Sequence, residues 1–184
     1  MRFLPAFLLL AILPMRAQDA KPVSMIGSRV ALRPSVKIAQ GTFTGLEKYF
    51  NQRIETLFGV DDPADLLGST RGVYLDGYGA VFTTEASLVV APSPNPFRPP
   101  ISRELADSIR KRKIERMPFL KAAMKDMMRK MAATLIQVPA DQQVVLIVRF
   151  YYQPWEDMNG MPSQILMRAD RKSALAGQIQ VEEQ

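Results

Sequence analysis

Two segments of the chain place apolar residues at the three- and four-residue spacing of an α-helix. The first begins near Thr42 and ends at Gly59. Its apolar stripe consists of Leu46, Tyr49, Phe50, Ile54, Leu57 and Phe58. The second extends from Ser102 to about Gln137, and Pro118 lies inside it. Because proline has no amide hydrogen to donate, a kink or a break into two helices is predicted there.

Three other segments show the patterns of β-strands. Residues 71–90 alternate, with the even positions the more apolar, and Asp76-Gly77 is a typical hairpin turn. This segment therefore forms a hairpin or one long strand. Val144–Tyr152 is apolar on both faces except at Arg149, which predicts a covered central strand. An Asn-Gly turn follows, and Ser163–Ala169 is expected to return antiparallel to it.

The order of these elements predicts the fold class. Helix, hairpin, long helix and hairpin, with a last short helix capped by Asp170, fit an α+β two-layer sandwich. Its antiparallel four-stranded sheet would consist of the two hairpins, with the long kinked helix and the N-terminal helix packed on one face. We expect a single domain over residues 42–177, with a short helical turn at 61–67, a stiff proline-rich connector at 91–100 and a frayed tail at 178–184.

The N-terminus has the pattern of an export signal. Met1-Arg2 supplies a positive charge, and residues 3–14 are an apolar run shorter than a membrane helix. Cleavage is expected after Ala17, with Ala20 as the alternative. Residues 1–17 would then be a signal peptide and 18–41 an extended lead-in. We therefore expect a secreted or periplasmic protein that uses a Sec-type route and retains no transmembrane segment.

Composition narrows the chemistry. The chain has no cysteine and no histidine, which excludes disulfides, thiolate metal sites, lipoprotein modification and histidine-based catalysis. We expect no cofactor and no metal site. The net charge is +6. For an exported protein, an anionic lipid or glycan surface is a more plausible partner than nucleic acid.

Candidate ligand-binding residues lie at the predicted hairpin and around the central strand. Tyr74, Asp76 and Tyr78 lie among glycines that leave the backbone accessible, although such residues also serve simply to build a hairpin. Arg149 is expected to be partly buried and paired with Glu85 or Asp170. Trp155 follows the same strand and would frame a pocket or cover the sheet edge.

The second helix carries two further patterns. Its basic cluster, a candidate contact for an anionic surface, consists of Arg110, Lys111, Arg112, Lys113 and Arg116. The alternative is a solvated helix surface balanced by Glu104, Asp107 and Glu115. Its methionine stripe would form core, a partner-binding groove or a Cu(I) site. It consists of Met117, Met124, Met127, Met128 and Met131.

These observations favour one function and leave alternatives. The leading hypothesis is a non-catalytic binding or assembly domain of the cell envelope, whose partner is another envelope protein or a second copy. The alternative is a histidine-free hydrolase or lyase that acts on glycan or peptidoglycan through carboxylates such as Asp76, Glu85 and Asp170. A third hypothesis is peripheral membrane association through the basic cluster.

Overall fold

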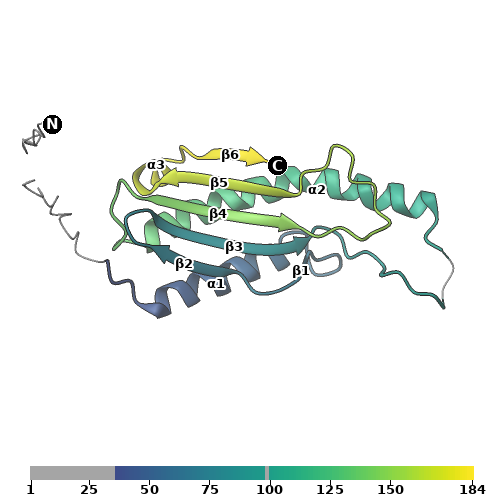
Figure 1. The fold of residues 1–184 in the computed structure, drawn as a ribbon, viewed down its shortest axis with the longest axis horizontal. Coiled ribbons are helices and arrows are strands. Elements are labelled where there is room, and N and C mark those ends of the chain that lie inside the picture. Colours follow the sequence, from purple (N-terminus) through teal and green to yellow (C-terminus); the bar gives the residue numbers. More distant parts are fainter. Residues whose placement is uncertain (1–35, 98–99) are drawn as a thin grey trace, which may run out of the picture. The chain divides into compact units, whose positions relative to one another are not determined.

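The computed structural model describes residues 36–97 and 100–184, so the expected leader and most of the lead-in lie outside the described residues. The described chain has an α+β fold in which helices pack on one mixed sheet (Figure 1). The helices are α1 (Gln40–Glu55), α2 (Arg103–Thr134) and α3 (Arg171–Leu175). The strands are β1 (Asp65–Leu66), β2 (Arg71–Leu75), β3 (Gly79–Ser87), β4 (Gln143–Phe150), β5 (Gln164–Asp170) and β6 (Gln180–Glu183).

Both predicted hairpins form, but the sheet is not wholly antiparallel. β2 pairs with β3 and β4 pairs with β5, each in antiparallel register. β3 and β4, however, lie side by side and parallel over eight residue pairs, from Gly79–Gln143 to Ala86–Phe150. The expected all-antiparallel sheet is therefore wrong. The reason is α2, which returns the chain to the end of the sheet where β3 begins, as a parallel connection requires.

The edges of the sheet also differ from the prediction. Asp65–Leu66 pairs with the last residues of β3, where a helical turn was expected. Gln180–Glu183 pairs with β5 and forms the opposite edge, where a frayed tail was expected. The sheet therefore has six strands in the order β1-β3-β4-β5-β6, with β2 also paired to β3.

The helix α2 is one continuous helix of 32 residues rather than two. Ser102 caps it by accepting a hydrogen bond from the Leu105 amide at 3.2 Å. Pro118 lies on its exposed side, and so does Ile114, whose carbonyl would otherwise receive the missing hydrogen bond. Because water can solvate that carbonyl, the helix passes through the proline without ending.

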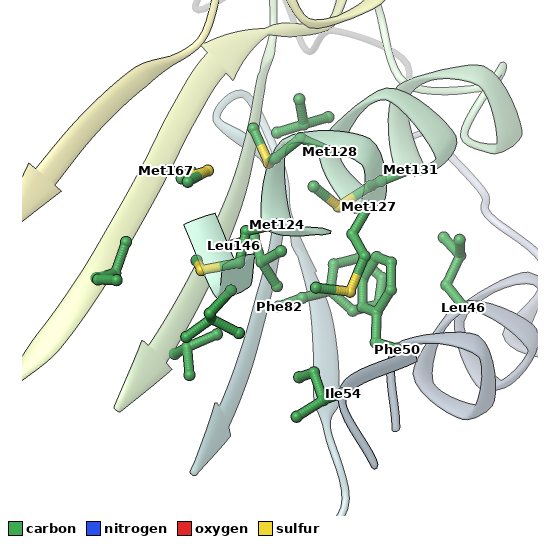
Figure 2. Packing of buried hydrophobic residues seen from close by; sticks show 14 of the residues in the cluster. Leu46, Phe50, Ile54, Phe82, Met124, Met127, Met128, Met131, Leu146 and Met167 are labelled. Atoms are coloured by element: carbon green, nitrogen blue, oxygen red, sulfur yellow. The ribbon is translucent and has the colours of Figure 1, made fainter. Parts of the chain in front are cut away.

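The core lies between the two main helices and one face of the sheet. Phe82 of β3 and Leu146 of β4 point inward and are fully buried. The methionine stripe packs on them from α2, as the core interpretation predicted, and Leu46, Phe50 and Ile54 pack from α1 (Figure 2). The rings of Phe50 and Phe82 meet edge to face, with centroids 5.2 Å apart. Unbranched methionines fit the irregular space between these rings and the strands.

Two glycines allow close approach inside this assembly. At Gly79, a Cβ would lie 1.9 Å from the backbone oxygen of Gln143, where β3 begins to pair with β4. At Gly72, a Cβ would lie 2.4 Å from the Phe82 ring and 2.6 Å from the Phe43 ring. Phe43 and Phe82 stack with centroids 5.3 Å apart, over the glycine's backbone. Any side chain at either position would displace a strand or an aromatic ring.

We predict that Phe50→Ala lowers the free energy of unfolding by about 3–5 kcal/mol, because it removes a fully buried ring from the contact with Phe82. Phe119→Ala is the matched control: this ring is 64% exposed on α2, and the change should stay within about 0.5 kcal/mol. Urea unfolding followed by circular dichroism measures both. Equal effects of the two substitutions would contradict the packing described here.

Candidate functional site

The sheet has one covered and one bare face. All three helices contribute buried residues to the cluster on the inner face, and Figure 1 shows α1 and α2 behind the strands. Within the described ranges, no helix packs on the other side, which we call the open face. Alternation along the strands assigns eighteen side chains to it. They are Asp65, Arg71, Val73, Leu75, Val81, Thr83, Glu85, Ser87, Gln143, Val145, Ile147, Arg149, Gln164, Leu166, Arg168, Asp170, Gln180 and Glu182.

The centre of the open face is aliphatic. Val145 and Ile147 lie on the central strand β4, with Val81 beside them on β3 and Leu166 on β5. Neighbouring side chains bury Val145 and leave the other three half-buried. At the β2 edge, Val73 is 49% exposed and Leu75 is 46% exposed. A continuous aliphatic area of this kind on a flat sheet is typical of a surface that binds another protein.

The three candidate ligand residues at the hairpin do not converge. Tyr74 points to the inner side, where its hydroxyl donates to the side-chain oxygen of Gln142 at 2.8 Å. Asp76 lies exposed in the turn, beside Gly77 with its positive φ of 76°. Tyr78 is 44% exposed and lines a polar cleft between the hairpin and the α3–β6 segment. The segment is thus a hairpin in which Gly77 serves the turn.

The cleft beside Tyr78 is lined by one carboxylate. Asp170 also lines this space of about 680 Å³, together with Arg168, Ser173 and Gln180. Its carboxylate accepts hydrogen bonds at 2.8 Å from the backbone amide and from the hydroxyl of Ser173, and so caps α3 as predicted. These two bonds lower the pKa of Asp170. The carboxylate is therefore already engaged in holding the helix.

The other proposed carboxylates lie elsewhere. Glu85 is opposite Arg149 on β4, whereas Asp170 is opposite Gln143, six residues earlier on that strand. At about 3.3 Å per residue, some 20 Å separates the two positions along the sheet. Asp170 is the one acid lining the cleft, so the described residues offer no facing pair of carboxylates there.

Arg149 is exposed on the open face, so the prediction that it is partly buried is wrong. The run of apolar residues predicted a strand covered on both faces. β4 is covered by helices on one face only, and its apolar residues Val145 and Ile147 belong to the open face together with Arg149. Glu85 is the neighbour of Arg149 across the parallel ladder, as one predicted pairing required. No ion pair forms between them in the described part of the chain.

Trp155 lies at the end of the sheet where β4 terminates. It is half-buried, and its indole nitrogen donates to the carbonyl oxygen of Pro92 at 3.1 Å. The ring closes one side of an apolar groove whose other walls are the proline-rich connector and the start of α2. The hydrogen bond ties the loop after β4 to the connector. Trp155 and the Tyr78 cleft are therefore at opposite ends of β4, and the predicted ligand residues form no single site.

The charge buried in this structure is Lys113 rather than Arg149. Its side chain is 2% exposed and that of its partner Glu156 is 5% exposed. The ammonium donates to both carboxylate oxygens, at 2.8 and 2.6 Å, and to the Tyr151 carbonyl at 3.4 Å. It also lies 4.7 Å from the centroid of the Tyr152 ring. Every donor of the ammonium therefore has a partner, as a buried cation requires.

Burial dominates the titration of this group of residues. Desolvation lowers the pKa of Lys113, and the hydrogen bond and charge of Glu156 oppose that shift. Burial and then the nearby Glu156 charge raise the pKa of Tyr152 to about 12. The Tyr152 hydroxyl donates to the Pro162 carbonyl at 2.7 Å, and Glu156 accepts from the Gln153 amide at 2.8 Å. This network fixes the loop between β4 and β5 on α2.

Three other members of the basic cluster also bind loops of the protein. Arg110 donates to the carbonyl of Asn159 at 2.6 Å, in the same loop. Arg112 and Arg116 both pair with Asp62, and Arg116 also donates to the carbonyl of Leu88. The Arg116 guanidinium lies over the Phe58 ring, 4.4 Å from its centroid. Lys111 remains exposed, with no ion pair among the described residues.

The partners of this cluster differ from those that the helix pattern predicted. That pattern indicated Glu104, Asp107 and Glu115, which are neighbours on the same helix, as the residues that balance the charge. In the described chain none of these three forms an ion pair with the cluster, and its acidic partners are loop residues 43–54 positions away, such as Asp62 and Glu156. The available signal was that five basic residues surround the helix, so some of them had to face the protein.

Residues 36–97 and 100–184 contain no group of three acidic side chains placed to hold a metal ion. No helix there is both long and apolar enough to cross a membrane. A scan against protein-family models and searches of curated proteins and solved structures found no match to this chain.

We predict that Glu156→Leu lowers the free energy of unfolding by about 3 kcal/mol, because it leaves the Lys113 ammonium buried without its counter-charge. Adding Lys113→Met should restore most of this loss, since an apolar pair of similar volume needs no solvation. Chemical denaturation measures both.

The matched control for this experiment is the exposed pair Lys121–Glu183. Glu183→Leu should cost less than about 1 kcal/mol, because that pair is partly solvated. A double variant no more stable than Glu156→Leu alone would show that the Lys113 site does more than neutralise a charge.

Proposed function

We propose that this chain is an exported, non-catalytic assembly domain of the cell envelope that binds another protein through its open face. The observation that carries the proposal is the one-sided arrangement of the helices, which leaves an aliphatic centre uncovered on the described sheet. Burying that centre against a partner would stabilise the complex by about 25 cal/mol for each Å² removed from water.

The form of the open face supports a protein partner rather than a small molecule. Small ligands bind in concave sites that surround most of their surface. The two hollows described above lie at the ends of the sheet, and Val81, Ile147 and Leu166 line neither of them. A sheet of aliphatic residues with charged residues at its margin instead has the anatomy of a protein–protein interface.

The alternatives gain less from the geometry. The carboxylate hydrolase would need a second acid beside Asp170 in the cleft, and the described lining supplies none. Membrane association through the basic cluster would need free cations, yet four of its five members are engaged with loops of the protein. Export is proposed from the leader pattern of residues 1–17 and is tested separately.

We predict that the protein recovered from the envelope of expressing cells begins at Gln18, because Ala17 offers the small residue that signal cleavage requires. Lys21 would be the first residue if Ala20 is used instead. Mass spectrometry of the N-terminal peptide measures this directly. Recovery of the intact Met1 terminus from the cytoplasmic fraction would overturn the export part of the proposal.

We predict that a photoreactive residue at position 73 on the open face forms one defined protein adduct in expressing cells. The same probe at position 48 should form none, because Lys48 is exposed on α1, away from the sheet. Immunoblotting after irradiation compares the two yields. Similar yields from both positions would mean that the open face has no preferred partner, and the assembly function would then fail.

A further inference from the structure

One row of the open face carries opposite charges at its two ends. The register aligns Arg71 of β2, Thr83 of β3, Ile147 of β4, Leu166 of β5 and Glu182 of β6 across the sheet. Ile147 is the middle member of this row, with two strands on each side. Arg71 is exposed, and the Glu182 side chain is 39% exposed and pairs with Arg168 at 2.8 Å.

We propose that the partner of the open face is a second copy of this chain, packed face to face about a two-fold axis that runs along β4; this inference rests on the function proposed above. Such an axis lies midway between the two sheets, directly over Ile147, and it exchanges the two edges of the sheet. Arg71 of each copy then lies over Glu182 of the other. A surface that complements itself in this way is what a two-fold dimer requires.

The apolar residues obey the same symmetry. Ile147 lies under the axis and meets its own counterpart, whereas Val145, already buried by its neighbours, supports Ile147 from the same strand. Thr83 lies over the partner's Leu166, and Val81 lies over the aliphatic stem of the partner's Arg168. The side chains of the two sheets would then pack against one another as in the core of an aligned sheet sandwich, in which the sheets are about 10 Å apart.

Two further charged residues of the face, Arg149 and Glu85, are also compatible with the axis. Arg149 lies under it, so the two copies bring two arginines together near one end of the interface. Each is flanked by Glu85 of its own sheet, and the axis places the partner's Glu85 on its other side, over Gln164. Two positive and two negative charges therefore alternate there, at the solvated margin where their net energy is small.

The size of the face fits a weak, reversible dimer. The five strands contain 33 residues, and at about 4.8 Å between strands and 3.3 Å per residue they cover roughly 520 Å² on each copy. Stable interfaces bury about 600–1,000 Å² per partner, and weaker ones bury less. An unrelated partner would need this area as well, but it would have no reason to match the charges at both edges of one row.

A charge exchange tests the inference. Arg71→Glu places like charges at both edge contacts of the dimer, and so does Glu182→Arg. Each single variant should therefore dimerise about tenfold more weakly than the wild-type chain at low ionic strength. An equimolar mixture of the two variants should regain the lost affinity, because each new side chain then faces its opposite and the other contact is native.

Sedimentation equilibrium of the full chain, expressed and purified, measures these affinities. Lys48→Glu makes the same change in net charge as Arg71→Glu, but on α1, and should leave the dimer unchanged. Thermal unfolding confirms that every variant is folded. Restoration in the mixture supports the two-fold dimer, since no purely structural effect of either substitution predicts it.

A wild-type chain that sediments as a monomer, or a mixture that associates no better than its components, overturns the inference. The photoreactive probe at position 73 then separates two outcomes. An adduct with a different protein would preserve the assembly function and replace the partner. With no adduct and no dimer, neither proposal stands.

Discussion

The parallel pairing of β3 and β4 constrains the rest of this fold. Two parallel strands need a crossover connection that returns the chain along the sheet, and α2 provides this connection. A helix of 32 residues is about 48 Å long, whereas the nine residues of β3 extend about 30 Å. Only part of the helix can therefore lie under the strands. The buried residues from Met117 to Met131 occupy that part, and the segment before Met117 extends past the sheet (Figure 1).

The projecting part of α2 is held by charges because there is no sheet for it to cover. Lys113, Arg110, Arg112 and Arg116 bind the loops that lie beside it, through carboxylates and backbone carbonyls. The methionine stripe thus attaches one part of the long helix to the sheet, and the basic cluster attaches the other part to the loops. With the whole crossover on one side of the sheet, the opposite side keeps the aliphatic residues on which the proposed assembly depends.

The sequence predicted the features that local patterns control. Helical spacing identified α1 and the buried methionines, and alternation with a turn signal identified the β2–β3 hairpin. Local patterns do not specify how distant segments pair or which face of the sheet the helices cover. The sequence around Arg149 would therefore be the same whether its face were covered or bare. Two-residue β1 is too short for any period to show. The partners of Lys113 and Arg116 also depend on how loops fold back, which the order of residues along one helix does not reveal.

The crowding at Gly72 and Gly79 has a consequence for the history of this protein. At these two points the neighbouring atoms are 1.9–2.6 Å from where a Cβ would be, so almost every mutation would be removed by selection. We therefore expect a distant relative with this fold to carry two glycines seven residues apart, the first within one strand and the second at the start of the next.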